Sequence, residues 1–163
     1  MAYIRTKKIN NHLYAYLVES LSTPSGPRQK VKQYLGRIYQ FDKTENVQQT
    51  NFGKTKESII NALVTSELCS RKFKKKDDFI ENKSLIYSQK SLTLSKKSKS
   101  KNKKEAIIKL NEGFLCSFTI QRILSFKKGK DIKKDGLKLA KYFFEAGLQI
   151  PKEQFVLFYQ MIK

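Results

Sequence analysis

Residues 3–36 read YIRTKKINNHLYAYLVESLSTPSGPRQKVKQYLG, and this stretch decides the expected fold. Two candidate strands, residues 3–9 and 12–21, flank Asn10-Asn11, a pair that tolerates the positive φ angles of a tight turn, and the second of them is rich in Tyr, Leu and Val. The loop that follows contains two prolines and a glycine, which interrupt a strand, and alternation resumes over residues 28–35. The sequence therefore predicts a three-stranded antiparallel sheet at the start of the chain.

Alternation along the second and third strands assigns their side chains to opposite faces. In the second strand the tyrosines alternate with Ala15 and Leu17, so tyrosines and small apolar residues are expected on different faces. In the third strand cations alternate with neutral residues. The residues expected to share one face of the third strand are Arg28, Lys30, Lys32 and Tyr34.

The rest of the chain is expected to have a polar, basic middle and a helical end. Apolar residues at helical spacing predict a helix over residues 55–69, whereas the lysine-rich tract 96–104 is expected to stay unfolded because its charges repel. Beyond that tract, the spacing over residues 107–126, an N-cap at Asp131 and a helix start at Pro151 predict three helices.

Together these elements predict an α+β fold in three segments. They are a three-stranded β-meander over residues 1–40, a linker with a short helix and basic tracts over 41–104, and a helical bundle over 105–163. The lysine-rich middle is expected to be partly disordered and the last segment to be a three-helix bundle. The buried side of the second bundle helix is expected to carry Leu137, Ala140, Phe144 and Leu148.

The charge of the chain is its most informative property. Lys and Arg total 34 against 14 Asp and Glu in 163 residues, which gives a formal net charge of +20. An excess of this size repels itself unless an anionic partner lies close by. Nucleic acid is the expected partner, because its phosphates attract clustered lysine and arginine.

Membrane and metal-binding classes fit the sequence poorly. No apolar run approaches the roughly 20 residues of a spanning helix, and the start lacks the apolar core of a signal peptide, so a cytoplasmic or nucleoid-associated protein is expected. His12 is the only histidine, and Cys69 and Cys116 stand far apart, so no metal site and no cofactor are expected. Both cysteines are expected to be reduced and buried.

Enzymatic motifs are also missing from the sequence. The chain has no glycine-rich phosphate loop, and its closest carboxylate pair, Asp77-Asp78, directly follows three lysines, which favours a solvated charge cluster over a metal site. We therefore expect a protein that is not an enzyme.

The expected sheet supplies the candidate binding surface. A small sheet can enter the major groove of DNA, where its side chains reach base edges and flanking lysines contact phosphates. Tyrosines on such a sheet can stack on bases or cover its apolar back. The sheet cations expected to contact nucleic acid are Arg5, Lys7, Lys8, Arg28, Lys30, Lys32 and Arg37. The tyrosines expected beside them are Tyr14, Tyr16 and Tyr34.

Two further basic runs supply charge without base-reading chemistry. Lysines on a flexible tract neutralise phosphates and release counterions, which raises the affinity for any duplex or folded RNA. A solvated linker that only keeps the protein soluble is the alternative. The cations of these runs are Arg71, Lys72, Lys74, Lys75 and Lys76 in the first and Lys96, Lys97, Lys99, Lys101, Lys103 and Lys104 in the second.

The opening segment also contains a distinctive series of short sequence motifs. They are Tyr-Ile-Arg at 3–5, Lys-Lys-Ile at 7–9 before the Asn turn, Leu-Tyr-Ala-Tyr-Leu-Val-Glu-Ser at 13–20, and Gln-Lys-Val-Lys-Gln-Tyr-Leu-Gly-Arg at 29–37. This series resembles the start of DDE-class insertion-sequence transposases of bacteria and archaea. The resemblance is confined to residues 1–40, and the catalytic domain of that family is absent. It implies a reused DNA-binding module and gives no support for transposition.

The sequence as a whole predicts a non-catalytic nucleic-acid-binding protein, with DNA favoured by the transposase-like opening. A basic RNA-binding or ribosome-associated protein is the first alternative, because lysine-rich tracts can fold on contact with RNA. An adaptor that recruits a protein partner through its C-terminal helices is the second. That alternative depends on aromatic side chains expected to be exposed there, namely Phe143, Phe144, Phe155, Phe158 and Tyr159.

Overall fold

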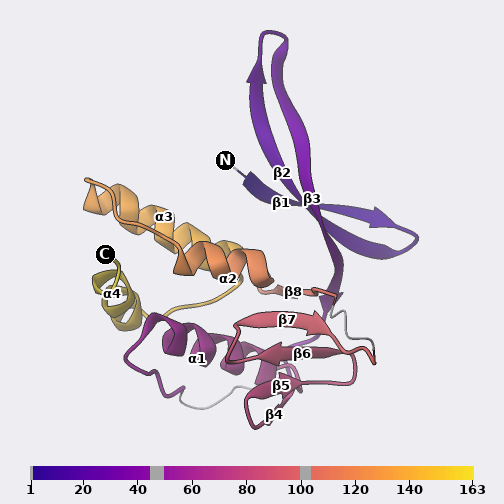
Figure 1. Ribbon diagram of the computed structural model, residues 1–163, viewed down its shortest axis with the longest axis vertical. Helices are drawn as coiled ribbons and strands as arrows, with labels where there is room; N and C mark the ends of the chain where they lie inside the picture. Colours follow the sequence, from indigo (N-terminus) through magenta and orange to yellow (C-terminus); the bar gives the residue numbers. More distant parts are fainter. Residues whose placement is uncertain (1, 45–49, 100–103) are drawn as a thin grey trace.

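The computed structural model describes residues 2–44, 50–99 and 104–163. Within these ranges the chain forms nine strands, arranged in two sheets, and four helices. Figure 1 shows the first sheet with a hairpin that projects from the body, the second sheet at the opposite end, and the helices to one side.

The first three strands overlap the three predicted ones, but the second and third extend beyond the predicted bounds of 12–21 and 28–35. β1 (Ala2–Ile9), β2 (His12–Thr23) and β3 (Gly26–Gln40) pair antiparallel in that order. Asn10 and Asn11 turn the chain between β1 and β2 with φ angles of 46° and 62°, in the left-handed region that asparagine tolerates. Local turn chemistry thus accounts for the meander.

Two strands from the C-terminal part of the chain extend this sheet. β8 (Ile107–Leu110) runs parallel to the end of β3, and β9 (Gly113–Leu115) pairs antiparallel with β8, so the strand order is β1-β2-β3-β8-β9. The predicted three-stranded sheet is therefore wrong, as is the first half of the helix predicted over 107–126. Apolar residues three and four apart do not distinguish two short strands from a helix, and Asn111 turns the chain at φ 49°.

The middle of the chain forms a second sheet. β4 (Lys74–Lys76), β5 (Phe79–Glu81), β6 (Leu85–Ser88) and β7 (Thr93–Lys96) pair antiparallel in sequence order. The predicted partly disordered middle is therefore wrong for the residues that the structure describes. Three lysines can form β4 because it is an edge strand with one neighbour, and lysine on an edge also opposes pairing with other chains.

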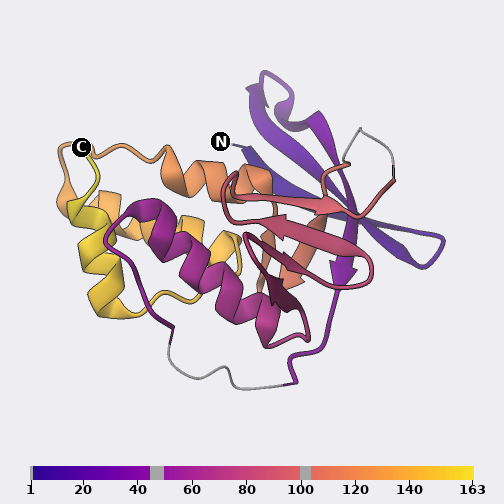
Figure 2. The ribbon, with the colours of Figure 1, turned by 60° about the horizontal axis from the view of Figure 1, so that its bottom comes forward.

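A helix covers the second sheet. α1 (Lys56–Cys69) corresponds to the helix predicted over 55–69. Thr55 caps its start, because Thr55 Oγ1 accepts from the Ser58 amide at 3.1 Å while Ser58 Oγ accepts from the Thr55 amide at 3.0 Å. Figure 2 shows α1 between the second sheet and the C-terminal helices. The sheet residues that pack with α1 in the larger hydrophobic core are Ile80, Leu85, Tyr87 and Leu94.

Three helices follow β9, but they do not form a separate bundle. They are α2 (Ser117–Leu124), α3 (Ile132–Glu145) and α4 (Lys152–Gln160), and they share one core with α1, β8 and β9. The predicted three-helix bundle is thus wrong. The predicted N-cap is confirmed, because Asp131 Oδ1 accepts from the backbone amides of Lys133 and Lys134 at 3.0 and 3.1 Å. No helix within the described ranges is both long and apolar enough to cross a membrane.

The buried side of α3 differs from the prediction. α3 buries Leu139 and Phe143, whereas Leu137 and Phe144 are 66% and 62% exposed. The helix carries two apolar stripes, and hydrophobic spacing alone does not show which of them faces the core. Leu148, just after the helix, is buried as predicted.

Tyr87 shows how tightly the second sheet and α1 pack. Its ring is fully buried, and its hydroxyl donates to Asn61 Oδ1 on α1 at 2.7 Å. Burial raises the pKa of the Tyr87 phenol far above its ordinary value of 10.0, because the phenolate cannot be solvated there. The folded state therefore holds this proton more tightly than the unfolded state. The resulting stabilisation is full below the unfolded pKa and is lost as the pH rises towards the folded one.

We expect Tyr87 to ionise only when the protein unfolds at high pH. An alkaline titration that follows tyrosinate absorbance and circular dichroism together should show a late step that coincides with unfolding, and Tyr87→Phe should remove one tyrosine from that step. The matched control is Tyr3→Phe, on the first sheet, which should leave the late step intact. If Tyr87→Phe instead removed one tyrosine from the early step of the titration, before unfolding, the buried hydrogen bond of Tyr87 would be contradicted.

Candidate nucleic-acid interface

Cross-strand pairing gathers cations and tyrosines on one side of the first sheet. Directly paired residues lie on the same face of a sheet. Arg5 pairs with Tyr16 and Lys7 with Tyr14, while Tyr16 also pairs with Tyr34 and Tyr14 with Arg37. We call this side the open face, and its residues are Tyr3, Arg5, Lys7, Tyr14, Tyr16, Val18, Gln29, Val31, Tyr34 and Arg37.

The opposite side of these strands is packed against the rest of the protein. Its apolar side chains form a second, smaller hydrophobic core with residues from β8, β9 and α2. The members of that core are Ala15, Leu17, Leu35, Ile38, Ile107 and Cys116, with Phe114 and Phe118 against them. The packed side fixes the strands, so the side chains of the open face project from a rigid support.

A bulge in β3 brings Tyr34 to the open face. Val18 pairs with Val31 but Leu17 pairs with Gln33, so Lys32 is an extra residue without a partner opposite. One extra residue reverses the alternation of the strand beyond it. The predicted common face of Tyr34 with Arg28 and Lys30 is therefore wrong.

Three tyrosines form a cluster at the centre of the open face. The rings of Tyr16 and Tyr34 have centroids 5.3 Å apart, and those of Tyr14 and Tyr34 are 6.3 Å apart. Tyr34 is nevertheless 54% exposed, so much of its ring faces solvent. Partial burial, with the other two phenols close by, raises the pKa of Tyr34 above its ordinary value of 10.0.

Cations lie on both sides of this cluster. On β1, Arg5 Nη1 donates to Gln29 Oε1 at 2.5 Å, and Gln29 Nε2 donates to the hydroxyl of Tyr3 at 2.5 Å. On β3, the guanidinium of Arg37 lies over the ring of Tyr39, 5.4 Å from its centroid. Both arginines are thus held by neighbours while they remain exposed.

Acidic charge is nearly absent from these strands. Glu19 is the only acidic residue in the sequence before Asp42. Its carboxylate accepts from Lys32 Nζ at 2.8 Å, and this contact lowers the pKa of Glu19. Glu19 pairs with Lys30 across the strands, so it lies on the side opposite to the open face. No carboxylate therefore offsets the cations of the open face within β1, β2 and β3.

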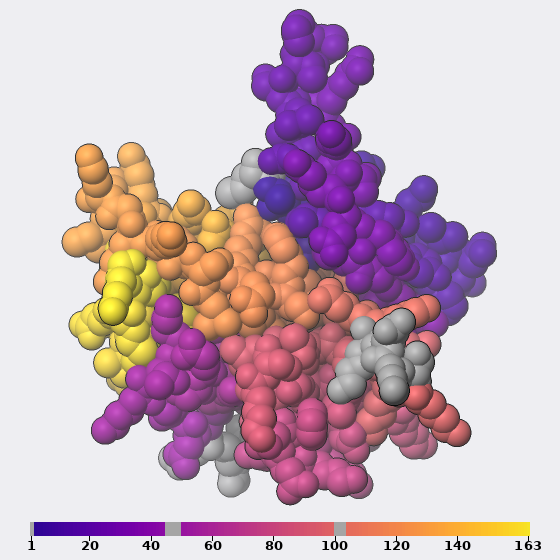
Figure 3. Space-filling model, in the orientation of Figure 1, coloured from indigo at the N-terminus to yellow at the C-terminus, as the bar shows by residue number. Residues whose placement is uncertain are grey.

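The other predicted sheet cations lie elsewhere. Lys8 pairs with Leu13 and so points to the side opposite to the open face. Arg28 and Lys30 lie on the far end of the β2–β3 hairpin, residues 20–30, which we call the arm. Figure 3 shows the arm projecting from the body. Of the predicted sheet cations, Arg5, Lys7 and Arg37 thus lie on the open face and Arg28 and Lys30 on the arm, whereas Lys8 and the bulge residue Lys32, which pairs with Glu19, belong to neither set.

The two basic runs are ordered more than predicted. Arg71 is only 7% exposed, and its Nη1 donates to Glu67 Oε2 at 2.5 Å. Lys97 pairs with Glu81 at 2.9 Å. Lys101 and Lys103 lie outside the described residues. The cations of these runs that are exposed are Lys72, Lys74, Lys75, Lys76, Lys96, Lys97, Lys99 and Lys104.

Four residues of the open face were not among the predicted binding residues, namely Tyr3, Val18, Gln29 and Val31. Tyr3, Arg5 and Lys7 occupy every second position of the strand and so share one face, which means that the strand pattern already placed Tyr3 there. Gln29 and Val31 were assigned to the face opposite to Tyr34, and no glycine or proline marks the bulge that joins them to it.

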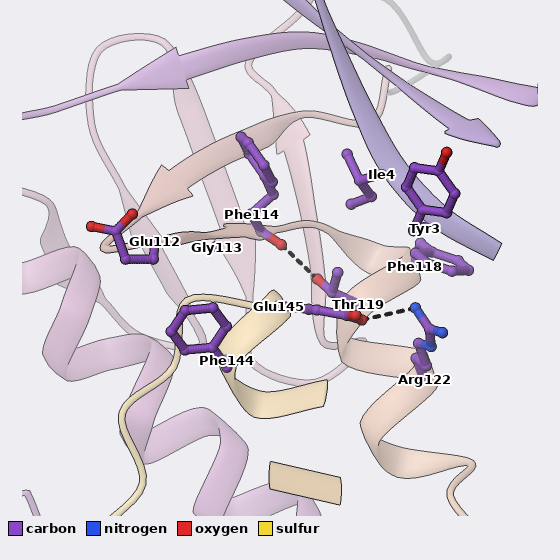
Figure 4. A pocket seen from close by; sticks show the side chains of 10 residues that line it. All are labelled: Tyr3, Ile4, Glu112, Gly113, Phe114, Phe118, Thr119, Arg122, Phe144 and Glu145. Carbon is purple, nitrogen blue, oxygen red and sulfur yellow. Dashed lines mark hydrogen bonds and ion pairs between the residues drawn. The ribbon is translucent and has the colours of Figure 1, made fainter. Parts of the chain in front are cut away.

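A separate crevice lies where the two edges of the first sheet face one another. It has a volume of about 150 Å³ and is lined by residues of β1, β9, α2 and α3 (Figure 4). Arg122 Nη1 donates to Glu145 Oε2 at 2.9 Å, and its guanidinium lies 4.4 Å from the ring centroid of Tyr142. Thr119 Oγ1 donates to the Phe114 carbonyl at 2.9 Å. These polar groups hydrogen-bond within the protein, so we assign the crevice a structural role.

The side chains that could bind a metal ion and the two cysteines lie apart in the described part of the chain. Across 2–44, 50–99 and 104–163, no three His, Cys, Asp or Glu side chains lie together in a way that could hold a metal ion. Cys116 is buried and Cys69 is partly buried, and neither forms a disulfide. Burial raises the pKa of both thiols, which disfavours the reactive thiolate.

The aromatic residues behind the adaptor hypothesis are mostly covered. Phe143 and Phe158 are fully buried, and Phe155 and Tyr159 pack partly against the same core. Phe144 remains exposed, with Leu137 on the same helix. Recruitment of a protein partner stays a prediction, and Phe144 is the one of these five aromatic side chains that is exposed.

Comparison of the chain with protein-family models, with curated proteins and with solved structures gives no match in any of the three.

Proposed function

We propose that this protein binds nucleic acid without catalysing a reaction, and that the open face of the first sheet is its principal contact surface. The observation that carries the proposal is the arrangement of Arg5, Lys7 and Arg37 around the cluster of Tyr14, Tyr16 and Tyr34, with no carboxylate among them. Cations with interleaved aromatic rings suit a ligand that combines phosphates with flat bases.

The charge of the whole chain supports the same proposal. A formal charge of +20 attracts a polyanion over a long range, and the exposed lysines of the arm, β4 and β7 add contacts that do not depend on sequence. DNA is favoured because residues 1–40 resemble the start of insertion-sequence transposases. Such a protein would act in the cytoplasm or on the nucleoid, and binding to RNA or to a ribosome is the competing outcome.

A charge-matched pair of triple variants tests this proposal. Arg5→Gln/Lys7→Gln/Arg37→Gln removes three cations from the open face, and we expect its affinity for a labelled DNA oligonucleotide to fall by about tenfold or more, with a salt dependence shallower by about two to three in log–log slope. The loss arises because fixed cations on the contact surface release counterions on binding. Fluorescence anisotropy across a salt series measures both quantities.

The control is Lys133→Gln/Lys138→Gln/Lys152→Gln, which removes the same charge from exposed positions on α3 and α4. We expect the affinity of the control to fall by less than about threefold, because those lysines act only through the long-range field. Equal losses in the two variants would show that net charge alone governs binding. Failure of the native protein to bind DNA or RNA at low salt would overturn the proposal.

A further inference from the structure

A hollow lies on the open face beside the tyrosine cluster. It has a volume of about 340 Å³ and is lined by Arg5, Thr6, Lys7, Tyr16, Val18 and Val31. The lining is apolar at Val18, which is 1% exposed, and at Val31, which is 58% exposed. Two cations complete the lining. An apolar lining with adjacent cations matches the chemistry of a nucleotide, which joins a flat apolar base to an anionic phosphate.

The cation best placed to meet a phosphate is already oriented. Arg5 Nη1 is held by Gln29, which is itself held by the hydroxyl of Tyr3, so the guanidinium needs little further ordering on binding. Lys7 lies two residues along the same strand, on the same face. The hollow therefore has one fixed and one adaptable cation beside an apolar wall.

Exposed apolar groups next to the hollow provide a surface for a second base. Tyr16 belongs both to the lining of the hollow and to the cluster with Tyr34, whose ring is 54% exposed. Aromatic side chains on an exposed sheet stack on bases that are not paired, whereas a duplex keeps the faces of its bases stacked on each other. The open face can use this chemistry only with an unpaired strand.

We propose that the open face selects single-stranded over double-stranded nucleic acid by taking an unpaired base into the hollow between Tyr16 and Val31. The neighbouring base stacks on Tyr34, and Arg5 and Lys7 contact the phosphate that joins the two nucleotides and the next phosphate along the strand. This inference depends on the proposed nucleic-acid binding and specifies its ligand.

The first test compares ligands of equal charge. The full-length protein is titrated by fluorescence anisotropy with a mixed-sequence DNA strand, with the abasic strand of the same length, and with a duplex of the same number of phosphates. Stacking contributes roughly 1–3 kcal/mol per base, so we expect the base-containing strand to bind about tenfold tighter than the other two.

The outcomes separate this inference from the proposed function. Equal or tighter binding of the duplex or the abasic strand would overturn the selection of unpaired bases while nucleic-acid binding itself survives. Absence of binding to every ligand at low salt would overturn both. Tighter binding of the matching RNA strand than of the DNA strand would support an unpaired ligand and replace DNA by RNA.

The second test assigns the selectivity to the tyrosine cluster. Tyr34→Leu should reduce the difference in affinity between the base-containing and the abasic strand, because one stacked base is lost while the base in the hollow remains. The affinity for the abasic strand should stay unchanged, and Tyr34→Phe should preserve the difference. Phe144→Leu, at an exposed aromatic on α3, is the control that removes a ring away from the open face. Because Tyr34 and Phe144 are both more than half exposed, all three variants should fold, and circular dichroism checks this. An equal loss of affinity for both strands in Tyr34→Leu would overturn the stacking role.

Discussion

Gly147→Ala is expected to lower the free energy of unfolding by about 3–5 kcal/mol, because the residue combines a left-handed backbone with a close backbone contact. Gly147 has a φ angle of +72°. A Cβ atom there would lie 2.2 Å from the Leu110 carbonyl oxygen and 2.7 Å from Leu110 Cβ. The atoms it meets are backbone or close to backbone, so they cannot move aside as the end of a long side chain can.

Gly113, at the start of β9, faces the same close backbone contact between the β8–β9 turn and the end of α3. A Cβ atom on Gly113 would lie 2.3 Å from the Gly147 amide nitrogen and from the Phe144 carbonyl oxygen. The side chain of Asn111 donates to the Gly147 carbonyl at 2.8 Å and ties the turn to the end of α3. Gly113→Ala is therefore expected to destabilise the protein by a similar amount.

Gly136→Ala is the matched control for both glycines. Gly136 lies within α3, and an added Cβ would meet no atom within 4 Å. Alanine is preferred to glycine in a helix by about 1 kcal/mol, so this variant should be unchanged or slightly more stable. Chemical denaturation followed by circular dichroism measures all three variants. A loss below about 1 kcal/mol in Gly147→Ala would show that the strand turn and α3 do not meet as described.

Local chemistry in the sequence was sufficient to predict several elements. The Asn10-Asn11 turn and the N-cap of α3 at Asp131 each depend on a few adjacent residues, and both are confirmed. The helix predicted over 55–69 from its apolar spacing is also observed, as α1. The pairing of β8 with β3 was not predictable in this way. It pairs Ile38 with Ile107, and in the sequence the whole of the second sheet lies between these two residues. No local pattern specifies so distant a partner.

The candidate interface shows the same division. The first predicted strand, residues 3–9, already contained the cations Arg5 and Lys7, and the register of the first hairpin brings them beside the tyrosines. The side that Tyr34 faces depends on the bulge at Lys32, which the sequence does not mark. The face of a residue beyond a bulge therefore cannot be read from alternation alone.

The basic run 71–76 shows that charge in a sequence does not reveal burial. Its lysines are exposed, but Arg71 is 7% exposed and belongs to an ion pair with Glu67, which is 8% exposed. Arg71 Nη1 also donates to the Glu67 carbonyl oxygen at 2.9 Å. The (i, i+4) spacing of the pair lets the arginine just beyond the C-terminal end of α1 fold back on the helix. Arg71 therefore has a structural role in the folded protein.

Arg71→Leu is expected to lower the free energy of unfolding by about 3–5 kcal/mol, since it leaves the carboxylate of Glu67 buried without its main partner. The nearest remaining cation is Lys43, whose Nζ lies 3.8 Å from Glu67 Oε1. The double variant Glu67→Leu/Arg71→Leu should lose much less stability than the single one, because no buried charge is left uncompensated. Denaturant unfolding of both variants gives the two free energies.

The control for charge is Lys74→Leu, which removes an exposed cation from the same run and should change the free energy of unfolding by less than about 0.5 kcal/mol. In conditions where Arg71→Leu is folded, its affinity for DNA should equal that of the native protein, because the buried guanidinium does not reach a phosphate. If Arg71→Leu is instead as stable as the native protein and binds DNA more weakly, Arg71 acts at the surface and the buried pair does not form in solution. Stability and affinity measured on the same variant thus decide whether this cation serves the fold or the ligand.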